Sequence, residues 1–581
     1  MSATHALLNR LKAYVRSEAK AQYDAITAQW SQPLALRVAK GWAIEGVRVV
    51  IVQQGRITLH CDTNNSRFRE GDLVILHRGN PLNPQALHLD LEYDGETDLE
   101  ARLIDGNELH LASHPTGWII DQDYLDLSHY YEQALNIAAD SNRGRSVILP
   151  LLGGSRQGTI DYARYERAVT ALEGSGLNPS QVEAVALAYA ADLLHLIQGP
   201  PGTGKTLALA HLAKLLAEDG QRVLVTGLTH RSINNALNKI HQVDRKLPIS
   251  KIGNRQRAED FRGECFESFP ESGFGDLPGG YVVGATPFAL YTDRLSNVEF
   301  DVVLFDEASQ VTLPLAIMGM LAGDKYIFFG DENQLPPVSV FSLKDAVTYS
   351  IFNFLADRGD QTLLNITYRL NDVLVDWPNQ TFYGGRLQPD PAAAVRRLQL
   401  SGTHSPWDLA LDPAVPAVFL DLCHTNTTVR SRQEAETVVE LILALLEHNI
   451  PPDEIGVVVP YRAQSRLIRS LLRRALQDED TLAEIVVDTV ERMQGQEREV
   501  VLVSFATSSL AFAHQVAEFL FQPQRLNVAV TRPRTKLILV GSRHMLTAPA
   551  SPNPAHTELF DLLRGLVDSC RVITLPQGRL T

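Results

Sequence analysis

The spacing of apolar positions predicts a helix and then a small β domain at the start of the chain. The first thirty residues carry apolar side chains at helical intervals and predict one amphipathic helix. Beyond residue 37 the period shortens to two, and six runs predict the strands of a small antiparallel barrel: VRVVIVQ, RITLHC, DLVILHR, LHLDLEY, LEARLI and ELHLAS. The pairs Asp94-Gly95 and Asp105-Gly106 lie between such runs and predict hairpin turns. Helical spacing returns over residues 124–139 and 160–172.

From residue 177 onward, strongly apolar strands alternate with helices. A first series contains LLHLIQ, RVLVTG, FDVVLFD and KYIFFGD, and a second, after about residue 360, contains AVFLDL, EIGVVVP, EIVVDTV, EVVLVSFA and KLILVG. Strands that are apolar on both faces are typical of parallel sheets covered by helices. The predicted fold class is therefore α/β, with two tandem parallel-sheet domains behind a helix and a small antiparallel barrel. The expected segments are a helix over 1–36, the barrel over 37–125, a helical linker over 126–175, and α/β domains over 176–360 and 361–581.

Composition narrows the possible environments of the chain. Its 581 residues are enough for three or four domains. A formal net charge of −15 argues against coating nucleic acid by bulk charge, although a local basic channel remains compatible with it. The four cysteines are too scattered for a disulfide framework or a zinc site. With neither a secretory signal nor a membrane-spanning stretch in the sequence, we expect a cytoplasmic protein without membrane association.

One segment has the pattern of a phosphate-binding loop. It follows the strand LLHLIQ, opens a helix and matches G-x-x-x-x-G-K-[ST] through Gly199, Pro200, Pro201, Gly202, Thr203, Gly204, Lys205 and Thr206. Glycines let backbone N–H groups converge on phosphate oxygens at the positive end of the helix. We expect Lys205 to reach the β- and γ-phosphates and the Thr206 hydroxyl to bind Mg²⁺.

A second segment supplies two adjacent carboxylates. The strand FDVVLF ends at Asp306 and Glu307, so both side chains lie at the sheet edge where ligands bind. Asp306 is expected to hold Mg²⁺, and Glu307 to position and deprotonate the attacking water. Together with the loop, this pair predicts hydrolysis of a nucleoside triphosphate, with ATP and Mg²⁺ as cofactors.

Six further motifs resemble those of superfamily 1 helicases, in particular the group typified by the nonsense-mediated-decay RNA helicase and the immunoglobulin-mu-binding helicase. They are LNPSQ (177–181), GDENQLPP (330–337), TYR (367–369), VPYRAQ (459–464), DTVERMQGQE (488–497) and RLNVAVTR (525–532). The resemblance implies two RecA-like domains behind a barrel on a helical stalk. It also implies roles for six side chains: Gln181 reading adenine, Gln334 sensing the γ-phosphate, Tyr368 stacking on adenine, Glu497 near the ribose, and Arg369 and Arg532 as arginine fingers. Because the fingers and the loop lie in different domains, hydrolysis should require the cleft to close.

The residues that would bind a nucleic-acid strand form less specific motifs than the nucleotide site does. The resemblance implies nucleic-acid contacts for Thr229, Thr286, Tyr461 and Thr489. The sequence departs from the family after Thr229, and for Thr229 and Thr286 a role as helix caps is an equal alternative. Arginines at 462, 466, 469 and 473 share one helical face, which is either solvated or a nucleic-acid or partner surface.

These motifs favour an ATP-dependent helicase or translocase that moves 5′→3′ on single-stranded DNA or RNA, the polarity being implied by the resemblance alone. The alternative is an ATP-gated clamp that remodels nucleic-acid–protein complexes without processive unwinding. A P-loop ATPase acting on proteins is a third hypothesis, but it leaves the motifs of the second domain unexplained. We expect a monomer, with a recruiting protein or a separate nuclease as possible partners.

Overall fold

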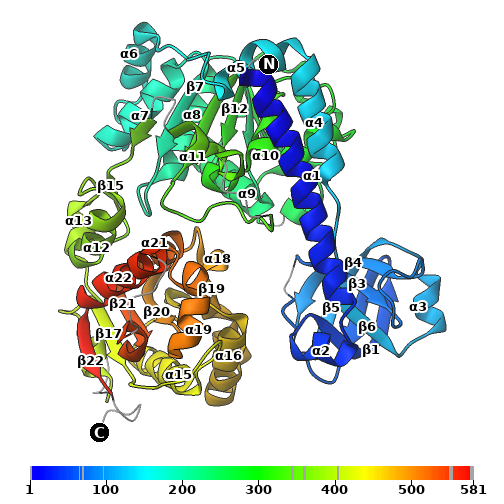
Figure 1. The fold of residues 1–581 in the computed structure, drawn as a ribbon. Helices are drawn as coiled ribbons and strands as arrows, with labels where there is room; N and C mark the ends of the chain where they lie inside the picture. Colours follow the sequence, from blue (N-terminus) through cyan, green and yellow to red (C-terminus); the bar gives the residue numbers. More distant parts are fainter. Residues whose placement is uncertain are drawn as a thin grey trace. The chain divides into compact units, whose positions relative to one another are not determined.

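The structure is a computed structural model. It describes residues 3–64, 66–68, 71–95, 97–258, 260–341, 346–356, 361–401, 405–547 and 554–575. The chain divides into two compact units, unit 1 (Met1–Ser141 with Val338–Thr348) and unit 2 (Asn142–Pro337 with Tyr349–Thr581) (Figure 1). No helix in the described ranges is both long enough and apolar enough to span a membrane.

Unit 1 contains a closed antiparallel barrel with the strand order β1-β2-β5-β4-β3-β6 (Figure 1). Its strands are β1 (Ala43–Gln53), β2 (Arg56–His60), β3 (Leu73–His77), β4 (Leu87–Asp94), β5 (Asp98–Asp105) and β6 (Trp118–Gln122). Side chains alternate along each strand, so Leu87, Leu89 and Leu91 of β4 all point into the fully buried core. The predicted barrel is therefore confirmed.

The sixth strand of the barrel differs from the prediction. The run ELHLAS was expected to be a strand, but Leu109–Ser113 forms the short helix α3, and β6 closes the barrel instead. Gly106 adopts a φ of 121°, and the Asn107 side chain accepts a hydrogen bond from the Leu109 N–H (3.0 Å). This local turn chemistry starts a helix where the alternating pattern alone suggested a strand. Asp105-Gly106 is consequently not a hairpin turn.

Besides α3, the described part of unit 1 contains the helices α1 (Ala3–Trp30), α2 (Leu34–Ala39) and α4 (Ser128–Asp140). Helix α4 packs along α1, where Arg16 pairs with Glu132 (2.7 Å) and Lys12 donates to Asn136 (2.7 Å).

Residues 338–341 are hydrogen-bonded to α1 through the carboxylate of Glu18. Glu18 accepts hydrogen bonds from the Ser339 hydroxyl (2.6 Å) and from the backbone N–H groups of Val340 (2.9 Å) and Phe341 (2.7 Å). Burial opposes the charge of Glu18, but these hydrogen bonds outweigh burial and lower its pKa. Glu18 is thus an anionic anchor for a segment more than three hundred residues away in sequence.

The first half of unit 2 is an eight-stranded parallel sheet with the order β10-β9-β11-β8-β12-β13-β7-β14. Its strands are β7 (Leu194–Gln198), β8 (Arg222–Thr226), β9 (Ile249–Ile252), β10 (Glu264–Phe266), β11 (Tyr281–Gly284), β12 (Val302–Phe305), β13 (Lys325–Gly330) and β14 (Gln361–Leu363). Its helices are α5 (Leu149–Leu152), α6 (Tyr162–Ala171), α7 (Pro179–Ala190), α8 (Lys205–Glu218), α9 (His230–Val243), α10 (Leu313–Met320) and α11 (Ile351–Ala356). Because β14 pairs with β7, this sheet extends past residue 360, where the sequence placed the domain boundary.

The second half of unit 2 is a six-stranded parallel sheet with the order β19-β18-β20-β21-β17-β22. Its strands are β17 (Ala417–Asp421), β18 (Ile455–Val459), β19 (Val486–Thr489), β20 (Arg498–Ser504), β21 (Pro533–Gly541) and β22 (Arg571–Thr574). The two-stranded pair β15 (Ile366–Thr367) and β16 (Gln388–Pro389) lies between the sheets in sequence. The helices that follow β15 are α12 (Asp372–Phe382), α13 (Pro391–Ala394), α14 (Asp408–Leu411), α15 (Arg432–Glu447), α16 (Arg462–Leu476), α17 (Glu479–Glu484), α18 (Val490–Met493), α19 (Leu510–Gln515), α20 (Ala517–Leu520), α21 (Pro523–Val530) and α22 (Pro554–Asp568).

Both faces of the second sheet are buried. Val458 and Val503 pack into one apolar cluster, whereas Val457 and Leu502, which point the other way, pack into a second. This two-sided burial explains why the second series of runs is apolar throughout. The predicted fold class, two parallel-sheet α/β halves behind a barrel, is confirmed.

Candidate nucleotide site

The loop between β7 and α8 has the backbone shape of a phosphate cradle. Gly202 and Gly204 adopt φ angles of 74° and 75°, which other residues rarely accept. A Cβ on Gly202 would lie 2.4 Å from that of Arg369, and one on Gly204 would lie 2.5 Å from Nε2 of Gln181. Glycine is therefore required at both positions for conformation and for space. Lys205 and Thr206 begin α8, as the motif predicted.

A buried ion pair links this loop to the end of β12. Lys205 Nζ lies 3.1 Å from Glu307 Oε1, and both side chains are largely buried. Burial opposes the charge of Lys205, but Glu307 and Asp306 outweigh it and raise the lysine pKa. Burial likewise opposes ionisation of Glu307, but Lys205 lowers its pKa overall. The lysine and the proposed base therefore stabilise each other's charged form.

Asp306 experiences the opposite balance. Burial, and then the adjacent charge of Glu307, raise its pKa to about 7, although Lys205 partly counteracts them. The carboxylate is almost fully buried, and its Oδ1 accepts a hydrogen bond from the Glu307 N–H (3.0 Å). A buried carboxylate with a raised pKa favours a bound cation, which would restore its ionised form.

The residues present fit a Mg²⁺–ATP complex. The glycine cradle suits phosphates, and the Thr206 hydroxyl and Asp306 supply oxygen ligands of the kind that Mg²⁺ prefers. Across the described ranges, His, Cys, Asp and Glu residues form no group of three that could hold a metal by themselves.

One side of the loop, where adenine is predicted to bind, is formed by α7 and the segment after β15. Gln181 completes a capping box with Asn178 and donates from Nε2 to the Thr203 carbonyl (2.9 Å), so its side chain supports the loop directly. Asn178 Nδ2 in turn donates to the Tyr368 hydroxyl (2.9 Å), and the Tyr368 ring remains partly exposed. Gln181 and Tyr368 thus lie together beside the loop, and their roles toward adenine remain predictions.

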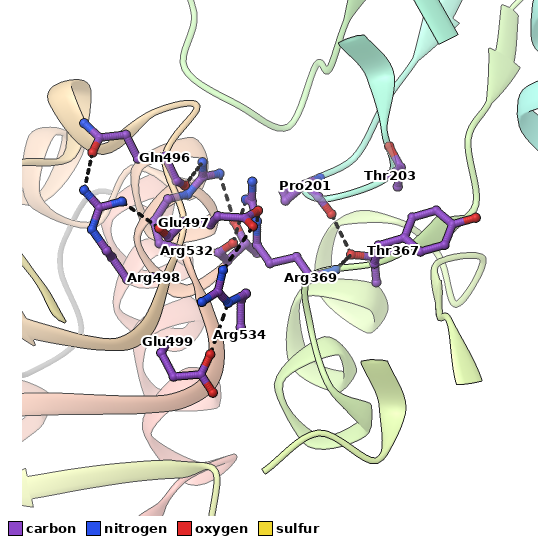
Figure 2. A network of polar contacts seen from close by, with 12 residues as sticks. Pro201, Thr203, Thr367, Arg369, Gln496, Glu497, Arg498, Glu499, Arg532 and Arg534 are labelled. Atoms are coloured by element: carbon purple, nitrogen blue, oxygen red, sulfur yellow. Dashed lines mark hydrogen bonds and ion pairs between the residues drawn. The ribbon is translucent and has the colours of Figure 1, made fainter. Parts of the chain in front are cut away.

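The segment carrying Arg369 joins the loop to the second sheet. The Thr367 hydroxyl donates to the Pro201 carbonyl (2.9 Å), and the Tyr368 N–H donates to the Gly202 carbonyl (2.8 Å). From there the Arg369 side chain reaches Glu497 (2.8 Å) and the Thr531 carbonyl (3.0 Å), both in the second half of unit 2 (Figure 2). One arginine therefore has its backbone beside the loop and its guanidinium beside the second sheet.

Arg532 lies in the same network and is almost completely buried (Figure 2). It donates to the carbonyls of Val528 (2.8 Å) and Gln496 (3.2 Å) and to the Thr531 hydroxyl (3.3 Å). Burial, then Arg369, lower its pKa to about 9, so the guanidinium keeps its charge at neutral pH. Within the described residues it forms no ion pair with a carboxylate. The charges of Glu307 and Glu497 act on Arg532, but its hydrogen bonds go to neutral groups, and such a buried guanidinium is suited to an anionic ligand.

The proposed sensor of the γ-phosphate is buried behind the loop. Gln334 donates from Nε2 to Asp331 Oδ2 (2.8 Å), and Asp331 follows β13, next to the strand that enters the loop. Asp331 Oδ1 also accepts from Gln198 Nε2 (3.3 Å) at the end of that neighbouring strand. Gln334 is therefore tied to the base of the nucleotide site.

The four predicted nucleic-acid residues lie apart from this network. Thr229 is exposed and caps α9 through the Ser232 N–H (3.2 Å), whereas Thr286 precedes a 3₁₀ turn without a side-chain cap bond. Tyr461 stacks on Phe519, with ring centroids 5.8 Å apart, and Thr489 is buried at the start of α18. Capping is thus observed for Thr229 only, and strand contacts for all four residues remain predictions.

The arginine face of α16 is partly engaged within the protein. Arg469 Nε donates to the Val487 carbonyl (3.0 Å), and Arg473 pairs with Glu479 (3.0 Å). These contacts favour a structural contribution from at least this part of the face.

Four residues of the site were not singled out from the sequence. Gln494 Nε2 donates to Glu307 Oε2 (3.3 Å) across the two halves, and Asp331, Tyr383 and Asn527 form a buried chain described below. Gln494, Asp331 and Asn527 all lie inside the quoted motifs, so their positions were available as a signal. Tyr383, in the sequence FYGG, lay outside every quoted motif.

Comparison with known proteins agrees with this arrangement. Residues 176–268 and 280–342 match a family described as AAA domain, and residues 347–544 match a second family of the same description. The two matches are adjacent and correspond to the two sheets of unit 2. The chain therefore carries two AAA domains, which take the place of the two expected α/β domains.

Two curated relatives show which kinds of protein the chain is similar to. The chain is 30% identical over 403 residues to the DNA replication ATP-dependent helicase/nuclease of Mus musculus, a match covering 63% of this chain and 37% of that protein. It is also 30% identical over 423 residues to the regulator of nonsense transcripts 1 homolog of Drosophila melanogaster, covering 64% and 35%. The chain thus spans about a third of the length of these curated relatives. A solved arterivirus nonstructural protein 10 (helicase) covers 91% of this chain and 82% of its own, at 14% identity and a TM-score of 0.39.

Proposed function

We propose that the chain is an ATP-dependent helicase or translocase that moves 5′→3′ along single-stranded DNA or RNA. The observation that carries this proposal is the meeting of both halves of unit 2 at one phosphate loop. Lys205 and Glu307 come from the first half, and Gln494 and Arg532 from the second, with Gln494 bonded directly to Glu307. Relatives named as ATP-dependent helicases support the same activity.

Each half supplies charge that the other lacks. Lys205 would neutralise the triphosphate from the first half, and Arg369 and Arg532 would stabilise the charge that develops on the transferred phosphoryl group. Thr206 and Asp306 would hold Mg²⁺, which supplies further charge neutralisation when bound. Glu307, kept ionised by Lys205, can accept the proton of the attacking water.

Because arginine fingers are worth about 10³–10⁵ in rate, hydrolysis depends on closure of the two halves. A cycle of closing and opening for each ATP, with each half holding the strand in turn, would produce movement in one direction. Thr229 and Thr286 in the first half, and Tyr461 and Thr489 in the second, are the proposed strand contacts. Polarity follows only from the family resemblance.

The proposal also includes a monomer that acts in the cytoplasm and is recruited by a partner protein or works with a separate nuclease. All four cysteines are free thiols, which supports a reducing compartment.

The decisive experiment is the ATPase rate of the full chain with matched single-stranded DNA and RNA over a series of salt concentrations. Stimulation that weakens as salt rises is expected, because phosphate contacts release counterions. No stimulation by either strand at low salt would refute the proposal.

The second candidate, an ATP-gated clamp that remodels complexes, rests on the same site. A forked duplex with a 5′ overhang tests unwinding, and streptavidin at one end of a single strand tests displacement. Displacement without unwinding would favour the clamp. Unwinding only of forks with a 3′ overhang would show movement in the opposite direction, 3′→5′, to the one proposed.

A further inference from the structure

The segment after β13 that carries Gln334 is bound by the second half of unit 2. Asn333 Nδ2 donates to the Phe382 carbonyl (3.0 Å) at the end of α12, and the Asn333 carbonyl accepts from Asn527 Nδ2 (2.7 Å) on α21. Leu335 packs into an apolar cluster with Val501 of the second sheet. Residues 333–335 therefore follow a strand of the first sheet but are held by backbone and side-chain groups of the second half.

The buried Tyr383 hydroxyl connects these contacts to Asp331. Tyr383 donates from its hydroxyl to Asp331 Oδ2 (2.8 Å) and accepts from Asn527 Nδ2 (2.9 Å). All three side chains are at most 1% exposed. Water therefore cannot replace either hydrogen bond without reorganisation of the interface.

The same carboxylate oxygen orients Gln334. Asp331 Oδ2 accepts from Gln334 Nε2 (2.8 Å) as well as from Tyr383, while Oδ1 accepts from the Asn333 N–H (3.2 Å) and from Gln198. Burial raises the pKa of Asp331, and these donors, led by Gln334 and Tyr383, counteract it. The position of Gln334 thus depends on Asp331, and the position of Asp331 depends on Tyr383.

We propose that Tyr383 is a positioning residue for hydrolysis: Asn527 holds its hydroxyl within the second half, and through Asp331 the hydroxyl sets the orientation of Gln334 only when the second half has closed on the first. This inference rests on the proposed ATPase function. Among the described residues, the Tyr383 hydroxyl bonds to Asp331 and Asn527 and to no residue of the phosphate loop, so its effect should fall on turnover and not on nucleotide binding. Through this series of hydrogen bonds from Asn527 through Tyr383 and Asp331 to Gln334, closure of the two halves would orient Gln334 toward the γ-phosphate.

The test removes only the hydroxyl, because the Tyr383 ring also packs in the apolar cluster. In the full chain, Tyr383→Phe should lower the kcat of nucleic-acid-stimulated ATP hydrolysis about 10- to 100-fold and leave the KM for ATP within about threefold, as for loss of an interaction made in the transition state. Tyr326→Phe is the matched control. Its hydroxyl is equally buried but donates to the Gly323 carbonyl (2.9 Å), away from the site.

Two further measurements separate positioning from general stability. Thermal unfolding should show similar losses for Tyr383→Phe and Tyr326→Phe, while only the former loses turnover. Asn527→Ala should lower kcat at least as much, because it also removes the hydrogen bond to the Asn333 carbonyl, and the double variant should lose little more than Asn527→Ala alone.

The inference is overturned if Tyr383→Phe keeps the wild-type kcat, if KM rises in step with the loss of kcat/KM, or if the two substitutions are fully additive. If Tyr383→Phe does not fold, a wild-type kcat in Asn527→Ala overturns it equally. A wild-type chain that hydrolyses no ATP removes the proposed function itself, whereas an active wild type with an unaffected Tyr383→Phe removes this inference alone.

Discussion

Replacement of Glu307 by glutamine should separate ATP binding from ATP hydrolysis. Lys205 Nζ lies 3.1 Å from Glu307 Oε1, so a triphosphate that binds the lysine has to compete with the carboxylate. Two unit charges about 4 Å apart attract by about 4 kcal/mol at an effective dielectric constant of about 20. Desolvation of both ions offsets most of this attraction, leaving a net value of about 1–2 kcal/mol. Glu307→Gln should therefore raise the affinity for ATP about 5- to 30-fold.

The same substitution removes the proposed general base. A general base contributes about 10²–10⁴ in rate, so turnover should fall by at least about a hundredfold. A titration with a fluorescent ATP analogue measures the affinity, and phosphate release under saturating ATP measures the turnover. Glu299→Gln is the control, because Glu299 forms an exposed pair with Arg143 (3.5 Å) and no contact with the site. Wild-type turnover in Glu307→Gln, or weaker ATP binding, would refute this reasoning.

Three further predictions address the loop, a buried lysine and unit 1. Lys205→Ala should weaken ATP binding and turnover together, and unchanged affinity would contradict the cradle assignment. Burial, then Arg164, lower the pKa of Lys325 to about 7; the folded state thus binds fewer protons than the unfolded state between about pH 7 and 10, and stability should rise with pH there. In Lys325→Met, the increase in the free energy of unfolding between about pH 7 and 10, measured by chemical denaturation, should be smaller by about 2–4 kcal/mol. The same pH dependence in the variant and the wild type would contradict this prediction. Glu18→Ala should speed chymotryptic cleavage at Phe341, compared with Glu132→Ala as the control, and equal cleavage in both would contradict the anchor.

The predictable part of the fold is the part with long, regular apolar patterns. The central strands of both parallel sheets, such as β12 and β18, were visible in the sequence as buried apolar runs, and so were five of the six barrel strands. β10 and β14 have only three residues each and join the sheet through pairing with distant strands, which no local pattern records. The helix α3 was missed because the side chain of Asn107, and not the apolar period, decides the local backbone.

The site was predictable to the extent that its residues lie in short motifs. The loop and the carboxylates at the end of β12 lie in short local motifs, so the sequence alone predicts that Lys205 and Glu307 belong to one site, and the structure brings the two side chains together. The contact of Tyr383 with Asp331 spans 52 residues, and that with Asn527 spans 144, so only the folded chain brings them together. Gln181 shows a further limit: its motif suggested adenine recognition, whereas its observed contacts cap α7 and support Thr203.

The central claim is that two halves of the chain complete one triphosphate site, and Arg532 tests it most directly. Arg532→Gln retains a polar side chain that can still donate to the Val528 or Gln496 carbonyl, which limits the loss of stability. Phosphate release by the full chain under saturating ATP should fall about 10³-fold or more in this variant, with the KM for ATP changed only a few-fold. Turnover within twofold of the wild-type rate would contradict the claim.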